Sequence, residues 1–122
     1  MAPKKILIVD DEPNFRKLIQ EYFKSVGYEV SVAQNTEEAI TLFKRRKPRV
    51  VLLDFNMPMM TGDQFLPFLQ GHDPMVKVIV LTGCIEEEVE EKFRGLGYFA
   101  FFEKGSLSLE KLREKVDEAF NY

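Results

Sequence analysis

Four short apolar runs of this sequence each end in polar residues of types that do chemistry. They are Asp10 and Asp11 after the first run, Asp54 after the second, Thr82 after the third and Lys104 after the last. The carboxyl ends of parallel strands form the ligand crevice of an open α/β sheet. We therefore expect these five side chains to gather at one edge of such a sheet.

Three carboxylates in one crevice repel one another unless a cation lies between them. Oxygen donors without His or Cys favour Mg²⁺, with Mn²⁺ also acceptable. The Lys104 ammonium could balance further negative charge, and the Thr82 hydroxyl could donate to an anion's oxygen. A carboxylate nucleophile, a divalent cation, a hydroxyl and an ammonium together indicate phosphoryl transfer onto an aspartate.

Hydrophobic periodicity predicts the elements that position these residues. Strands are expected at 6–9, 28–33, 50–53, 76–82 and 98–102, with helices from Pro13 to Gly27, from Asn35 or Thr36 to Lys47, around 65–69, over 86–94 and from a Ser108 cap to Phe120. Pro67 is expected to shorten or distort the start of the third helix. Alternating strands and helices with right-handed crossovers predict an α/β fold of the flavodoxin-like type. It is a doubly wound, five-stranded parallel sheet of order 2-1-3-4-5 with five helices.

Composition excludes several classes of protein. The chain has 122 residues, of which 45% are hydrophobic and 30% charged, which fits one globular domain over residues 1–122. Its net charge of −3 argues against direct nucleic-acid binding. No apolar run approaches the ~20 residues of a membrane span, and the N-terminus does not resemble a signal peptide. One cysteine permits no internal disulfide, so we expect a cytoplasmic protein.

Four segments carry a family resemblance in order along the whole chain: 9–12 (VDDE), 53–62 (LDFNMPMMTG), 81–83 (LTG) and 101–104 (FFEK). They resemble the receiver domain of bacterial two-component response regulators. The segment from Asp54 to Gly62 fits D-x-x-M-P-x-M-x-G and is highly specific, whereas the Asp pair, the Thr and the Lys would each be weak alone.

The resemblance implies that Asp54 is a phosphoacceptor. It would receive the phosphoryl group from the phosphohistidine of a sensor histidine kinase or phosphotransfer protein. Asp11, Asp54 and the backbone carbonyl of Asn56 would bind Mg²⁺ directly, and Asp10 would act through water. Catalysis would be limited to the protein's own phosphorylation and dephosphorylation, so the chain is not expected to be an enzyme in the usual sense.

The resemblance also implies a switch. Lys104 would pair with the phosphoryl group, Thr82 would move to hydrogen-bond it, and Phe101 occupies the family's aromatic switch position. The fourth helix, fifth strand and fifth helix would form the output surface, which signals to a downstream protein target or to an output domain missing from this chain. No membrane contact is expected, and the chain is either a stand-alone regulator or an excised receiver.

Several positions differ from the common family pattern or have more than one interpretation. Gly105 stands where family members commonly have Pro after the Lys, so the loop is expected to lack a cis peptide and to be more mobile. Asn56 and Cys84 occupy positions that tune the lifetime of the phosphoryl group in the family. The acidic run over 86–91 either complements the dipole of the fourth helix or selects a basic partner.

Two other functions fit the same fold. One is a receiver-like interaction module that works without phosphorylation, against which the intact set of site residues counts. The other is a haloacid-dehalogenase-like phosphatase, which also uses an Asp nucleophile. That family carries a second Asp two residues after the nucleophile, where this chain has Asn56. A dinucleotide carrier is disfavoured because no G-x-G-x-x-G follows the first strand.

Overall fold

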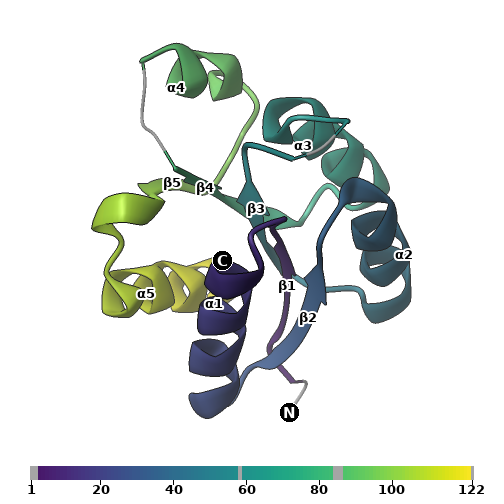
Figure 1. Cartoon of the computed structure of the whole chain (residues 1–122). Coiled ribbons are helices and arrows are strands. Elements are labelled where there is room, and N and C mark those ends of the chain that lie inside the picture. The colour runs from purple at the N-terminus through teal and green to yellow at the C-terminus, as the bar shows by residue number, and fades with distance from the viewer. Residues whose placement is uncertain (1–2, 58, 84–86, 122) are drawn as a thin grey trace.

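The computed structural model describes residues 3–57, 59–83 and 87–121, and it contains one parallel sheet (Figure 1). Its strands are β1 (Lys5–Val9), β2 (Glu29–Ala33), β3 (Val50–Asp54), β4 (Lys77–Thr82) and β5 (Ala100–Glu103). All pairings are parallel, and the strand order is β2-β1-β3-β4-β5. The predicted fold class and strand order are confirmed.

Helices cover both faces of the sheet (Figure 1). They are α1 (Pro13–Ser25), α2 (Thr36–Arg46), α3 (Gly62–His72), α4 (Glu87–Phe93) and α5 (Leu109–Phe120), and a 3₁₀ turn, η1, spans Lys104–Ser106. Capping residues in the sequence explain where several of these helices begin. Pro13 opens α1, and the side chains of Asn35 and Ser108 accept hydrogen bonds from the backbone N–H groups of Glu38 and Lys111.

The core forms two layers, one on each face of the sheet. On one face α1 and α5 pack through residues such as Phe23 and Leu112, and on the other α2, α3 and α4 pack through Phe43, Phe65 and Phe93. Strand β3 is buried along its whole length because both layers cover it. The continuous apolar run at 50–53 reflects this position at the centre of a parallel sheet.

The expectation that Pro67 shortens the third helix is wrong. Helix α3 begins at Gly62, ahead of the proline, and continues through it to His72. The Gln64 side chain accepts a hydrogen bond from the Thr61 backbone N–H at 3.2 Å, which fixes the start independently of Pro67. The proline ring is exposed, so the helix accommodates it on its outer face.

The last strand also differs from its prediction, since it covers Ala100–Glu103 rather than 98–102. The aromatic residues in and just before this strand pack on both core layers. Phe101 packs on the layer of α2 to α4, whereas Phe102 and the preceding Phe99 pack on the layer of α1 and α5. Among the described helices, none combines the length and apolar character needed to cross a membrane.

Candidate functional site

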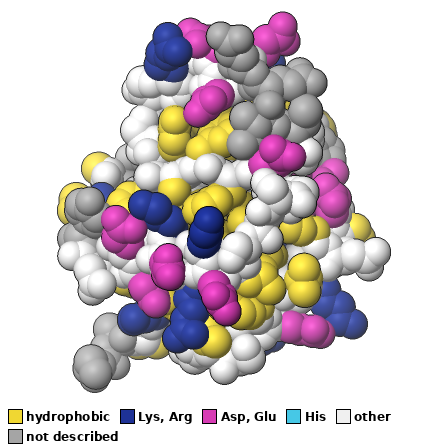
Figure 2. Space-filling view, turned by 90° about the vertical axis from the view of Figure 1, so that its left-hand side faces the viewer, with side chains coloured by type: hydrophobic (Ala, Val, Ile, Leu, Met, Phe, Trp, Pro, Cys, Tyr) yellow, Lys and Arg dark blue, Asp and Glu magenta, His cyan; other side chains and the backbone are white. Residues whose placement is uncertain are grey.

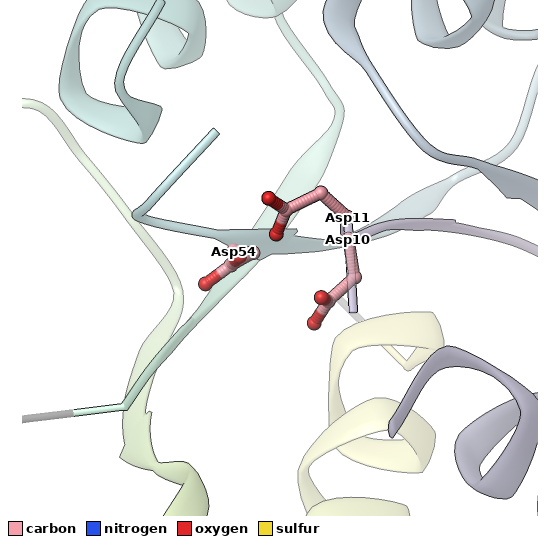
Figure 3. Close-up of side chains that lie close together, drawn as sticks. All are labelled: Asp10, Asp11 and Asp54. Carbon is pink, nitrogen blue, oxygen red and sulfur yellow. The ribbon is translucent and has the colours of Figure 1, made fainter. Parts of the chain in front are cut away.

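Two neighbouring central strands bring the carboxylates together. Val9 of β1 is in register with Leu53 of β3, so the next residues lie side by side: Asp10 directly after β1 and Asp54 as the last residue of β3. A carboxylate oxygen from each of Asp10, Asp11 and Asp54 lies within 4.8 Å of the others. Figure 3 shows Asp10 and Asp11 following β1 and Asp54 at the end of β3.

Burial makes this acidic cluster unusual. Asp10 and Asp54 are 1% and 2% exposed, whereas Asp11 is open to solvent. Within the part of the chain that the structure describes, Asp54 Oδ2 is buried without a hydrogen-bond partner. A buried, unpartnered carboxylate oxygen is costly, and a divalent cation would satisfy it. The oxygen donor set therefore fits Mg²⁺.

Lys104 lies among the carboxylates, as the sequence predicts. Its Nζ is 2.8 Å from Asp10 Oδ2 and 3.4 Å from Asp54 Oδ1, and its side chain is 8% exposed. A third carboxylate, that of Glu12, lies 3.0 Å from the same Nζ. The ammonium also lies 4.5 Å from the centre of the Phe15 ring, a cation–π contact that covers it from one side.

The electrostatics of the site follow from this burial. Desolvation, together with the neighbouring Asp10 charge, raises the pKa of Asp54 to about 7, although Lys104 opposes the shift. Desolvation also raises the pKa of Asp10, against hydrogen bonds from Lys104 and the Glu12 N–H. For Lys104, burial lowers the pKa, but its contacts with Asp10 and Glu12 outweigh that effect and raise it overall.

The other predicted site residues occupy nearby strand and loop ends. Asn56 donates its backbone N–H to Asp54 Oδ1 at 3.4 Å, which places the loop after β3 over the carboxylate. Thr82 ends β4 and is fully buried, next to Leu81, which is in register with Asp54. Phe101 lies in β5, half-buried, with its ring 5.6 Å from that of Phe93.

Sequence reasoning missed two partners of Lys104, Glu12 and Phe15. Glu12 was visible only as the last letter of the VDDE motif, and Phe15 only as an apolar position of a helix.

Three predicted features, Pro58, Cys84 and Glu86, lie outside the described residues, and the side chain of Glu87 is not described either. The peptide bond between Lys104 and Gly105 is trans, as are all other described ones.

Comparison with known proteins gives one family. The family model of the response regulator receiver domain matches residues 6–117. Sporulation initiation phosphotransferase F of Bacillus subtilis is 32% identical over 116 residues, which make up 95% of this chain and 93% of that protein. Regulatory protein AtoC of Escherichia coli is 36% identical over 82% of this chain. The match covers 22% of AtoC, so the chain spans less than a quarter of that relative.

Solved structures share the fold along almost the whole chain. A CheY-like response regulator receiver domain protein from Methanospirillum hungatei superposes with a TM-score of 0.87 and 27% identity, covering 98% of both chains. The chemotaxis protein CheY4 of Vibrio cholerae has a TM-score of 0.88 and 25% identity, covering 97% of this chain and 99% of its own. These neighbours support the arrangement of strands and helices described above.

Proposed function

This chain belongs to the response regulator receiver domain family, and from that membership we propose that Asp54 accepts a phosphoryl group. The donor is the phosphohistidine of a sensor histidine kinase or of a phosphotransfer protein. The observation that carries the proposal is the position of Asp54 at the end of the central strand β3, beside two further aspartates and within 3.4 Å of the Lys104 ammonium.

The metal of the proposed reaction is Mg²⁺, with Mn²⁺ as a substitute. Asp11, Asp54 and the backbone carbonyl of Asn56 would hold it directly, and Asp10 would do so through water. The ion supplies positive charge that neutralises the transferring phosphoryl oxygens. The unpartnered Asp54 Oδ2 and the oxygen-only donor set support this assignment.

The transfer itself requires little from the protein beyond positioning. A carboxylate oxygen of Asp54 attacks phosphorus, the P–N bond to the donor imidazole breaks, and its electron pair leaves with the imidazole nitrogen. Lys104 lies beside the Asp54 Oδ1 atom, so its ammonium can form an ion pair with the phosphoryl oxygens once the group has been transferred. Any catalysis concerns only the chain's own phosphorylation and dephosphorylation.

The proposed switch couples this site to the face formed by α4, β5 and α5. Phosphorylation adds about −1.5 to −2 charges and three acceptor oxygens, which can draw in the Thr82 hydroxyl. Phe101 lies in β5 of the same face and would change its packing with that movement. Figure 2 views the side where these elements lie in Figure 1, and acidic side chains border hydrophobic ones at its upper end.

The chain as a whole would act as a single receiver domain over residues 1–122, in the cytoplasm. Its signal would pass to a downstream protein or to an output domain. The exposed acids of α4, Glu88, Glu90 and Glu91, favour a basic partner at this face, in addition to complementing the helix dipole. Asn56, in place of a second Asp, disfavours a haloacid-dehalogenase-like phosphatase, because a general acid-base is missing there.

Intact-mass analysis after incubation with acetyl phosphate and Mg²⁺ tests the proposal. We expect one phosphoryl adduct that requires the metal and is absent from Asp54→Asn. Persistent full labelling of Asp54→Asn would contradict the assignment. Steady release of phosphate from unrelated phosphoesters would instead support the phosphatase. If the protein stays unmodified both with acetyl phosphate and with phosphorylated histidine kinases, the result would support an interaction module that needs no phosphorylation.

A further inference from the structure

Glu12 is the one charged residue at the site that is both in contact with Lys104 and largely open to solvent, among the residues described. Its side chain is 60% exposed, whereas those of Asp10 and Asp54 are almost fully buried. Its Oε1 atom nevertheless lies 3.0 Å from Lys104 Nζ. The Glu12 carboxylate therefore lies between solvent and the buried Lys104 ammonium.

A role in helix capping does not explain this placement. Glu12 is the N-cap residue of α1, yet its side chain makes no capping hydrogen bond. Its backbone N–H is used elsewhere, in a 2.8 Å hydrogen bond to Asp10 Oδ1. The backbone thus fixes Glu12 to the acidic cluster, and the carboxylate is left to face Lys104.

The contact has a cost for an incoming phosphoryl group. Lys104 is shared among three carboxylates, so phosphoryl oxygens must compete with Glu12 for its hydrogen bonds. The Glu12 charge also repels any anion that approaches Asp54 from solvent, since like charges a few ångströms apart disfavour each other. Both effects grow with the negative charge of the donor.

We propose that Glu12 is a specificity-determining residue for phosphodonors, which disfavours strongly anionic small molecules at the Asp54 pocket. The residue acts through its charge on the approach of the donor and on Lys104, not on the reacting atoms. A protein donor offsets this repulsion with contacts of its own elsewhere on the surface, whereas a small molecule has none. This inference rests on the proposed phosphoacceptor function.

The test compares labelling rates of the full chain with two small donors, acetyl phosphate and phosphoramidate, at saturating Mg²⁺. Acetyl phosphate is the more negative donor, because phosphoramidate carries a protonated amine. Glu12→Gln removes the charge and keeps the shape, and Glu12→Asp keeps the charge. Glu21→Gln, at an exposed position on α1, changes the net charge by the same amount and is the matched control.

We expect Glu12→Gln to be labelled by acetyl phosphate about fivefold faster at low ionic strength, with a smaller gain for phosphoramidate. The gain should shrink as salt is added, and Glu12→Asp and Glu21→Gln should stay within about twofold of the parent chain. An unchanged rate in Glu12→Gln, an equal gain with both donors, or the same gain in Glu21→Gln would overturn the inference. Labelling that survives in Asp54→Asn would instead refute the phosphoacceptor function itself.

Discussion

Burial gives the carboxylates of this site different properties at the scale of single residues. Asp11 is exposed and can meet a hydrated cation at low cost, whereas Asp54 is enclosed and has a pKa raised to about 7 by desolvation and by Asp10. A cation beside Asp54 would favour its ionised form. Binding of Mg²⁺ near neutral pH should therefore release protons, and it would leave Asp54 in the ionised form that the proposed phosphoryl transfer requires.

The raised pKa of Asp54 has a consequence for stability without metal. The ordinary pKa of the carboxyl group is 3.8, and in the folded chain the pKa of Asp54 is about 7. Between about pH 4 and pH 7, Asp54 is therefore protonated in the folded chain but ionised in the unfolded chain. The stabilisation is complete below about pH 4 and is lost as the pH rises towards 7. In chelator, Asp54→Asn should gain stability over the parent chain across this interval.

Chemical denaturation at a series of pH values measures this difference. We expect a gain on the order of 2–4 kcal/mol for Asp54→Asn at pH 8 and almost none at pH 4. Asp10→Asn, at the neighbouring buried carboxylate whose pKa is also raised, should show the same direction. A stability difference that is independent of pH would mean that Asp54 is not buried as a charged group in the metal-free protein.

Residue types at strand ends made most of the site predictable, because the topology of a parallel sheet brings those ends together. The partners of Lys104 were not predictable in the same way. Phe15 follows the apolar spacing of α1 like any core residue, and Glu12 follows two other acids. Only the path of the chain after β1 turns their side chains onto the ammonium.

At the scale of elements, helix α4 depends on one aromatic residue. The helix has seven residues, too few to be stable in isolation. Its Phe93 is fully buried, with ring centres 5.9 Å from Phe55 and 5.6 Å from Phe101. Phe55 directly follows the proposed phosphoacceptor, so Phe93 packs between the candidate site and β5, the strand that carries the proposed switch residue Phe101.

Truncation of this ring should therefore loosen α4 and weaken the fold. Phe93→Ala is expected to lower the free energy of unfolding by about 3 kcal/mol, the low end for a buried Phe. Val89→Ala, on the same helix and half-buried, should cost about 1 kcal/mol or less. Equal effects of the two substitutions in urea denaturation would show that α4 is not anchored through Phe93.

Sequence periodicity predicted the five α-helices and five strands of the described chain, because buried strands and amphipathic helices have clear patterns. It did not predict η1 at Lys104–Ser106, since a single 3₁₀ turn has no periodic signal. The error at Pro67 has a different origin. The prediction for Pro67 used only the local backbone preference of proline. Helix α3 is stabilised by the hydrogen bond from the Thr61 N–H to the Gln64 side chain and by the buried side chains of Phe65, Leu66 and Leu69.

At the scale of the whole molecule, a metal that binds only the folded chain should stabilise it. The pocket draws its proposed ligands from the last residue of β3 and from the segments after β1 and β3, so it exists only when the central strands are paired. Mg²⁺ at a hundred times its dissociation constant should add about 2.7 kcal/mol to the free energy of unfolding.

Thermal unfolding with and without Mg²⁺ tests this linkage. Asp11→Ala should weaken Mg²⁺ binding at least tenfold and remove most of the metal-dependent rise in the unfolding midpoint. Glu21→Ala, which deletes an exposed carboxylate on α1, should leave both unchanged. An Asp11→Ala chain with an unaltered magnesium titration would mean that the metal lies elsewhere.

Borohydride trapping locates the phosphoryl group within the chain and so tests whether Asp54 carries it. Borohydride reduces an aspartyl phosphate to homoserine, which peptide mass analysis places within the sequence. After incubation with acetyl phosphate and Mg²⁺, we predict homoserine at position 54 and at no other aspartate, including the neighbouring Asp10 and Asp11. Homoserine at another position, with Asp54 unmodified, would show that Asp54 is not the phosphoacceptor.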